Sequence, residues 1–231
     1  MIYLITFAYG NIYESVQKLF DSSLDILGAD RHVKYSAKDI IGTKFYENNK
    51  KIFSIKKGFG LYIWKPYIIY DQLSKIEYGD YIFYCDCSRH FPTGFTCSIR
   101  PAIEYMENKN IDIMPGNFQM VENEYGSSDY CIYRIKQDHN FDVEKYKKTM
   151  QQCAGHIIIK KTNFSIKFVD EWLKYCQIEP CIKKTKTKKG FNNCDMSIFN
   201  ILLFIYGIKN PNQPLLKEDA RNHNIFLSRF S

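Results

Sequence analysis

The residue whose position most suggests chemistry is Asp86, because it directly follows the continuous apolar run at residues 81–85. Such a run is typical of a central parallel strand that is covered on both faces. Open α/β sheets bind ligands at the carboxyl ends of their strands, and an unpaired carboxylate is costly to bury there. We therefore expect Asp86 to meet a cation, a hydrogen-bond donor or a cleft. A divalent ion would suit it, with Ser88 adding an oxygen ligand; the structural alternative is a helix cap or a turn.

A second group of candidates lies between Gly58 and Pro66. Lys65 stands just before Pro66, which suits the first turn of a helix. An ammonium there can bind phosphate or a sugar, or Lys65 can be an ordinary surface lysine. Trp64 and Phe59 can stack on a base or a sugar, although aromatic residues in such stretches are more often core. Gly58 and Gly60 allow close approach of a ligand, or simply make a turn.

Two further aspartates stand at predicted helix starts. Asp195 begins the apolar helix expected over residues 195–206, and Asp129 follows Ser127 and Ser128, either of which can cap a helix. From the pattern alone each aspartate is equally a helix-terminus residue, because carboxylates stabilise that position.

The order of predicted strands and helices along the chain indicates how these residues are positioned. Strands alternate with amphipathic helices, which predicts an α/β fold with a mostly parallel central sheet and helices on both faces. Residues 48–60 are expected to form a long loop, and Asn163 is expected to cap a helix over 163–176. The expected strands are 2–7, 31–35, 81–85, one or two within 111–122, and 154–160; the other expected helices are 13–27, from Pro66 to near 78, and 98–106.

Composition limits the class of protein. The chain has 231 residues, of which 45% are hydrophobic and 25% charged, which fits one globular domain over residues 1–231. Eight cysteines without a small-domain spacing favour a reduced, cytoplasmic protein, with Cys85 and Cys87 on the same side of a strand. No apolar stretch is long enough for a transmembrane segment.

The formal charge of +7 comes largely from the lysine run at residues 183–189. Such a run is usually a solvated loop, although it can attract diphosphates, anionic glycans or nucleic acid. No nucleic-acid-binding signature accompanies it, so no nucleic acid is expected as a partner.

Several segments together resemble a known family. Gly58-Phe-Gly-Leu-Tyr-Ile-Trp64-Lys65-Pro66-Tyr67, followed by the strand that ends in Asp86, is similar to a group of bacterial and large-virus glycosyltransferases. Thr6-Phe7-Ala8 resembles the opening strand and donor-side turn of that group, residues 152–158 its later strand, and residues 193–199 its His-Asp-Gln-Ser-Ile-Phe segment. The resemblance covers nearly the whole chain in order.

The resemblance implies a nucleotide-diphospho-sugar transferase fold of the GT-A type and transfer of a sugar from a nucleotide-sugar donor to an acceptor hydroxyl of a glycan or glycoconjugate. It implies Mn²⁺ or Mg²⁺ at Asp86 and Ser88, and Asp195, with Asp129 at lower weight, as the residue that orients or deprotonates the acceptor. The donor-binding residues would be Thr6, Ala8, Tyr9, Trp64, Lys65, Asp86 and Ser88.

Two departures from the family pattern leave other functions open. Ser88 stands where a typical motif has a second carboxylate, which weakens metal binding, and Asn192, Asn193 and Cys194 replace the expected histidines. One alternative is a relative that binds a nucleotide-sugar or glycan without turnover. The other, suggested by the lysine run at residues 183–189 and not by these departures, is a basic nucleic-acid-binding α/β protein.

Overall fold

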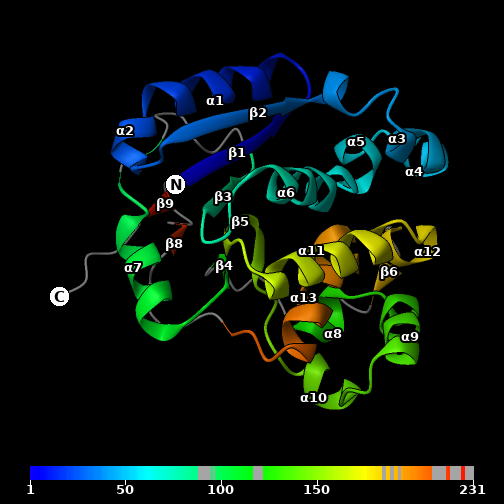
Figure 1. Ribbon diagram of the computed structural model, residues 1–231. Helices are drawn as coiled ribbons and strands as arrows, with labels where there is room; N and C mark the ends of the chain where they lie inside the picture. The colour runs from blue at the N-terminus through cyan, green and yellow to red at the C-terminus, as the bar shows by residue number, and fades with distance from the viewer. Residues whose placement is uncertain are drawn as a thin grey trace.

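A computed structural model describes residues 1–87, 95, 97–116, 122–183, 186, 187, 190, 191, 194–209, 217, 218, 225 and 226. Its centre is a five-stranded sheet in the order β2-β1-β3-β5-β4 (Figure 1). The sheet strands are β1 (Ile2–Ala8), β2 (Arg31–Ser36), β3 (Tyr81–Cys85), β4 (Ile113–Gly116) and β5 (Cys153–Lys160). Two small two-stranded sheets pair β6 (Lys186–Thr187) with β7 (Gly190–Phe191) and β8 (Lys217–Glu218) with β9 (Ile225–Phe226).

The sheet is mixed, which corrects the expectation of a mostly parallel one. β1 pairs in parallel with β2 and β3, whereas β5 runs antiparallel to both of its neighbours, β3 and β4. β5 therefore runs opposite to the other four strands. The apolar run of β3 could not reveal this, because a central strand buried on both faces looks the same whichever way its neighbour runs.

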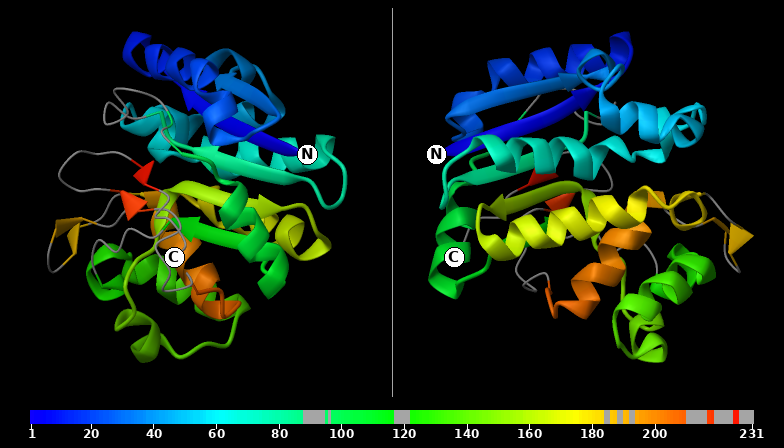
Figure 2. Two further views of the ribbon diagram at one scale, coloured as in Figure 1. Left: turned by 90° about the vertical axis from the view of Figure 1, so that its left-hand side faces the viewer. Right: turned by 45° about the vertical axis from the view of Figure 1, so that its right-hand side comes forward.

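Helices cover both faces of the sheet, as the alternation of elements predicts (Figures 1 and 2). Ile82 and Tyr84 of β3 point into a core shared with α6 (Trp64–Lys75), α11 (Asn163–Cys176) and α13 (Cys194–Ile205). Tyr81, Phe83 and Cys85 point into a second core shared with α1 (Asn11–Ser22), α2 (Leu24–Leu27) and α7 (Arg100–Lys109). Cys87 lies in the second core with Cys85, so the prediction that they share a face is confirmed.

The helices mostly lie where the periodicity predicts them, with differences at their ends. The long helices are α1 (Asn11–Ser22), α6 (Trp64–Lys75), α7 (Arg100–Lys109), α9 (Asp129–Asp138), α11 (Asn163–Cys176) and α13 (Cys194–Ile205). The short ones are α2 (Leu24–Leu27), η1 (Ala37–Asp39), α3 (Lys44–Asn48), α4 (Lys50–Phe53), α5 (Gly58–Leu61), α8 (Asn123–Gly126), α10 (Val143–Lys147) and α12 (Glu179–Ile182).

Three local predictions were wrong. The segment 48–60 contains α4 and most of α5 instead of a long loop, because Ile52 and Phe53 are buried in the core. The helix expected over 13–27 is divided at Ser23, which ends α1 and precedes α2. Thr162, not Asn163, caps α11: its side chain accepts a hydrogen bond from the backbone of Ser165, and the Ser165 hydroxyl accepts one in return.

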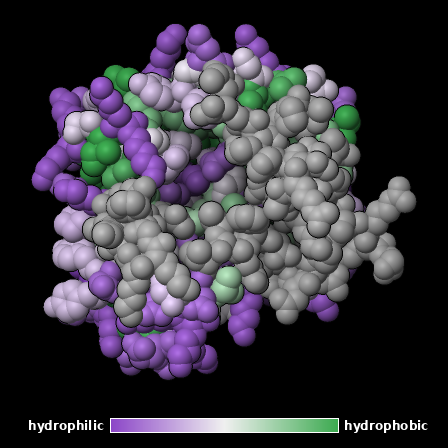
Figure 3. Space-filling view, turned by 180° about the vertical axis from the view of Figure 1, so that it is seen from behind, coloured by the Kyte–Doolittle hydropathy of each residue, from purple (hydrophilic) through white to green (hydrophobic). Residues whose placement is uncertain are grey.

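On the face seen from behind, the described surface is largely hydrophilic with small apolar areas and is hollowed near its middle (Figure 3). Within the described residues, no helix combines the length and apolar character needed to cross a bilayer. None of the eight cysteines, all of them described, is in a disulfide.

Candidate functional site

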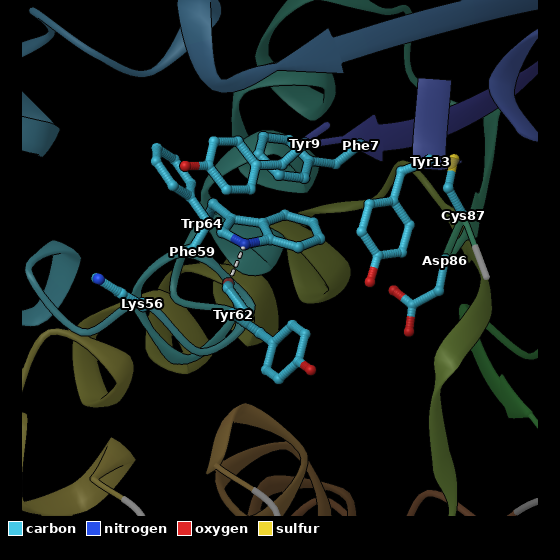
Figure 4. Close-up of a pocket in the computed structure, with 10 residues that line it drawn as sticks. Phe7, Tyr9, Tyr13, Lys56, Phe59, Tyr62, Trp64, Asp86 and Cys87 are labelled. Carbon is cyan, nitrogen blue, oxygen red and sulfur yellow. Dashed lines mark hydrogen bonds between the residues drawn. The ribbon is translucent and has the colours of Figure 1, made fainter. Parts of the chain in front are cut away.

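A pocket of about 330 Å³ opens where β1 and β3 end and α6 begins (Figure 4). It forms at the carboxyl ends of parallel strands, the position at which open α/β sheets bind ligands. Its described lining is mostly aromatic, with one basic and one acidic side chain: Phe7, Tyr9, Tyr13, Lys56, Gly58, Phe59, Tyr62, Trp64, Asp86 and Cys87.

One wall of the pocket is a stack of aromatic rings. The Trp64 ring lies on Phe7 with centroids 3.9 Å apart, and Phe59 lies on Tyr9 with centroids 4.7 Å apart. The indole N–H of Trp64 donates to the carbonyl oxygen of Gly58 at 2.8 Å, which fixes the ring. Flat aromatic faces of this kind suit the apolar face of a sugar or a nucleobase.

The backbone beside this wall is strained. Phe59, Leu61 and Tyr62 all have positive φ, at 48°, 58° and 66°, a region that non-glycine residues rarely occupy. Gly60, at φ 81°, packs so closely on Phe53 that a side chain would clash. Local strain of this kind persists where packing enforces it and is concentrated at functional sites.

Asp86 is the described acidic residue of the pocket. Its side chain is 38% exposed, and its Oδ1 lies 3.3 Å from Nζ of Lys65. The hydroxyl of Tyr84 donates to the same carboxylate oxygen. Tyr84 and Asp86 are two residues apart along the strand direction, so both project toward the same face. The carboxylate of Asp86 is thus bound by Lys65 and Tyr84 and is still accessible from the pocket.

Lys65, the second residue of α6, is buried at the centre of the charged groups. It is 4% exposed, which excludes the surface-lysine alternative. Its Nζ lies 3.1 Å from the carbonyl oxygen of Ala154 and 3.3 Å from Oδ2 of Asp195. Burial lowers the pKa of Lys65, but Asp195 and Asp86 outweigh burial and hold that pKa above its ordinary value. Lys65 is therefore an ammonium at neutral pH.

Asp195 contacts Lys65 and is not among the described residues that line the pocket. It is the second residue of α13 instead of its N-cap, and its side chain is only 5% exposed. The atom Oδ2 is fully enclosed and meets Lys65 as an ion pair without hydrogen-bond alignment. Burial raises the pKa of Asp195 to about 6, against the lowering effect of Lys65.

The structure brings some predicted site residues together and separates others. Lys65, Asp86 and Asp195 form one charged cluster. Tyr9 and Trp64 line the same pocket as Asp86. Ala8 is buried, and Thr6 is enclosed behind the pocket, where its hydroxyl contacts His32 and Gln17.

Asp129 is placed elsewhere. It lines a separate hollow of α9 and α10 together with Tyr133 and Phe141. Ser88, Asn192, Asn193 and most of the lysine run lie outside the described residues.

Sequence reasoning missed several residues of the site. Tyr84 was recoverable, because a residue two positions before Asp86 on a strand shares its face. Phe7 lies within the Thr6-Phe7-Ala8 segment of the resemblance but was not among the predicted donor-binding residues. Tyr13 and Lys56 carry no local signal, since they reach the pocket from segments that only the tertiary fold joins.

The described residues fit a divalent ion poorly. Such an ion takes several oxygen ligands, whereas no group of three described His, Cys, Asp or Glu side chains is placed to hold one. Asp86 faces an ammonium at 3.3 Å and also accepts from Tyr84. The other predicted ligand, Ser88, lies outside the described residues.

Comparisons with known proteins identify no family. No protein-family model matches the chain, and no curated protein matches it. Among solved structures, the fold is similar to mouse xyloside xylosyltransferase 1 in its apo form, with 10% identity and a TM-score of 0.47 over 90% of this chain and 83% of that one. A likeness this distant assigns neither an activity nor residue roles to the chain.

Proposed function

We propose that the chain is a glycosyltransferase that moves a sugar from a nucleotide-diphospho-sugar donor to an acceptor hydroxyl, in a fold of the GT-A type. The observation that carries the proposal is Asp86. This carboxylate follows a buried central strand, is held by Lys65 and Tyr84, and remains 38% exposed in an aromatic pocket.

Each part of the pocket has a role in this proposal. The rings of Tyr9, Phe59 and Trp64 offer flat apolar area for a base or a sugar face. Lys56, exposed at the pocket, attracts the phosphates. Asp86 accepts hydrogen bonds from ligand hydroxyl groups, which a carboxylate does more strongly than a neutral oxygen.

The test is the substitution Asp86→Asn, with Asp170→Asn on the exposed side of α11 as the matched control. Asp86→Asn should abolish sugar transfer and the thermal stabilisation of the protein by its donor, and leave the circular dichroism spectrum unchanged. The control should retain both properties. Normal transfer by Asp86→Asn would refute the assignment.

A second candidate is a protein that binds a nucleotide-sugar or glycan without turnover. It is favoured by one observation: Asp86 is the only acidic side chain in the described lining of the pocket, since Asp195 is enclosed. Transfer usually needs a group that takes the acceptor proton.

Calorimetry with UDP- and GDP-sugars, combined with an assay for donor hydrolysis and transfer, separates the two functions. Binding with turnover supports the transferase. Binding without turnover, across a panel of acceptors, supports the second candidate.

A further inference from the structure

The ammonium of Lys65 occupies the place where a bridging cation would be expected. Its Nζ has carboxylate oxygens of Asp86 at 3.3 and 3.5 Å, one of Asp195 at 3.3 Å and the carbonyl oxygen of Ala154 at 3.1 Å. These oxygens come from the end of β3, the start of α13 and from β5. A shell of oxygens from separate elements around one positive charge is the arrangement that a protein otherwise builds for a hard metal ion.

The positive charge of Lys65 is matched by carboxylates of the protein itself. Lys65 is only 4% exposed, and its ammonium is paired with the carboxylates of Asp86 and Asp195. Burial of Asp195 favours its neutral form below a pH of about 6, so the net charge is zero in that range and minus one above it. Asp86 receives a further hydrogen bond from Tyr84, so its charge is already stabilised by protein groups.

A divalent ion on Asp86 would meet the ammonium as a repelling neighbour. Both oxygens of this carboxylate lie within 3.5 Å of Nζ, so an ion in contact with either would stand a few ångströms from a fixed positive charge. Like charges at such distances repel strongly at a partly buried site, because water screens them less there than in bulk solvent.

We propose that Lys65 is the resident cation of this site, and that Asp86 recognises a hydroxyl-bearing ligand directly, with no divalent ion on its carboxylate. The proposal deepens the proposed function, since the ligand that function supplies is a sugar or the ribose of a nucleotide-sugar. Asp195 then acts through Lys65: it is a positioning residue that holds the ammonium against Asp86.

The test uses Mn²⁺ itself as the probe, followed by electron paramagnetic resonance on the full chain at pH 8. The wild-type protein and Asp86→Asn should give the same Mn²⁺ titration, because no ion occupies Asp86. Asp170→Asn serves as the control for the loss of one exposed carboxylate. A Mn²⁺ ion that binds the wild type and the control, and is lost from Asp86→Asn, would overturn the proposal.

A second measurement keeps this inference separate from the proposed function. Donor hydrolysis and transfer should proceed undiminished in EDTA. Activity that EDTA abolishes and Mn²⁺ restores would overturn the inference and leave glycosyl transfer standing. Absence of donor binding and turnover in both conditions would defeat the proposed function, while the Mn²⁺ titration would still decide which cation the site holds.

Discussion

The end of β3 and the start of α13 each present an aspartate to the same ammonium, yet the two aspartates have different surroundings. Asp86 and Asp195 both have a carboxylate oxygen 3.3 Å from Nζ of Lys65. The Asp86 side chain is 38% exposed and lines the pocket, whereas that of Asp195 is 5% exposed. The two aspartates are therefore equally close to the ammonium of Lys65, but only Asp86 is accessible to a ligand in the pocket.

The difference in exposure gives the two aspartates different roles: Asp86 binds the ligand, and Asp195 positions Lys65. A ligand can reach Asp86, so its charge is available for recognition. Asp195 is too enclosed to touch an acceptor hydroxyl in this conformation, and its burial is costly enough to raise its pKa to about 6. Asp195 thus affects the pocket by fixing Lys65, and the two carboxylates should respond differently to the same substitution.

Removing the shared cation should have the largest effect. Lys65→Met leaves two carboxylates without their ion-pair partner, one of them buried, which typically costs about 3–5 kcal/mol of unfolding free energy. The control is Lys160→Met, which breaks a more exposed pair with Glu107 and should cost less than about 1 kcal/mol. Urea denaturation of both variants measures the difference; equal losses would show that Lys65 does not hold the two carboxylates.

The next largest effect comes from Asp195 alone and is a dependence of the unfolding free energy on pH. Because the pKa of Asp195 is raised from 3.8 to about 6 on folding, the native protein keeps a proton that the unfolded chain has already lost between these values. This group therefore lowers the unfolding free energy as pH rises from about 4 to 6, by about 3 kcal/mol in all.

Asp195→Asn removes that titration. Unfolding free energies of the wild type and the variant, measured from pH 4 to 8, should shift in favour of the variant as pH rises from about 4 to 6 and differ by a constant amount above that range. Carboxyl groups with lowered pKa, such as Glu107, change stability in the opposite direction, but they are present in both proteins and cancel in the difference. A difference independent of pH would contradict the assignment.

Much of the frame of this site could be predicted from sequence. The apolar run before Asp86 predicts a central strand with the carboxylate at its end, and Pro66 lies in the first turn of α6, as predicted. Such signals are local: they depend on residues that are neighbours in the chain or lie on one face of one element.

The charged contacts depend on packing between distant elements, so the sequence alone could not give them. Lys65 has the same local pattern whether it snorkels to the surface or turns inward, and only the approach of α13 places Asp195 beside it. The direction of β5 could not be predicted for a similar reason. The same residues would be buried whether the strand ran parallel or antiparallel to β3. The burial of Asp195 likewise depends on contacts between distant segments of the chain, such as its ion pair with Lys65.

The smallest predicted effect tests the exposed carboxylate without changing any charge. A Cβ on Gly155 would lie 3.0 Å from Oδ2 of Asp86 and 3.3 Å from Sγ of Cys153, so Gly155→Ala should push the carboxylate by a few tenths of an ångström. We expect donor affinity to fall a few-fold, equivalent to roughly 1 kcal/mol or less, with the unfolding free energy nearly unchanged. Calorimetric titration of the donor measures the change, and Asp170→Asn, on the exposed side of α11, serves as the control that should bind the donor like the wild type. If Gly155→Ala leaves the donor affinity unchanged, the position of the Asp86 carboxylate does not govern binding, and the distinction between the open and the enclosed aspartate loses its support.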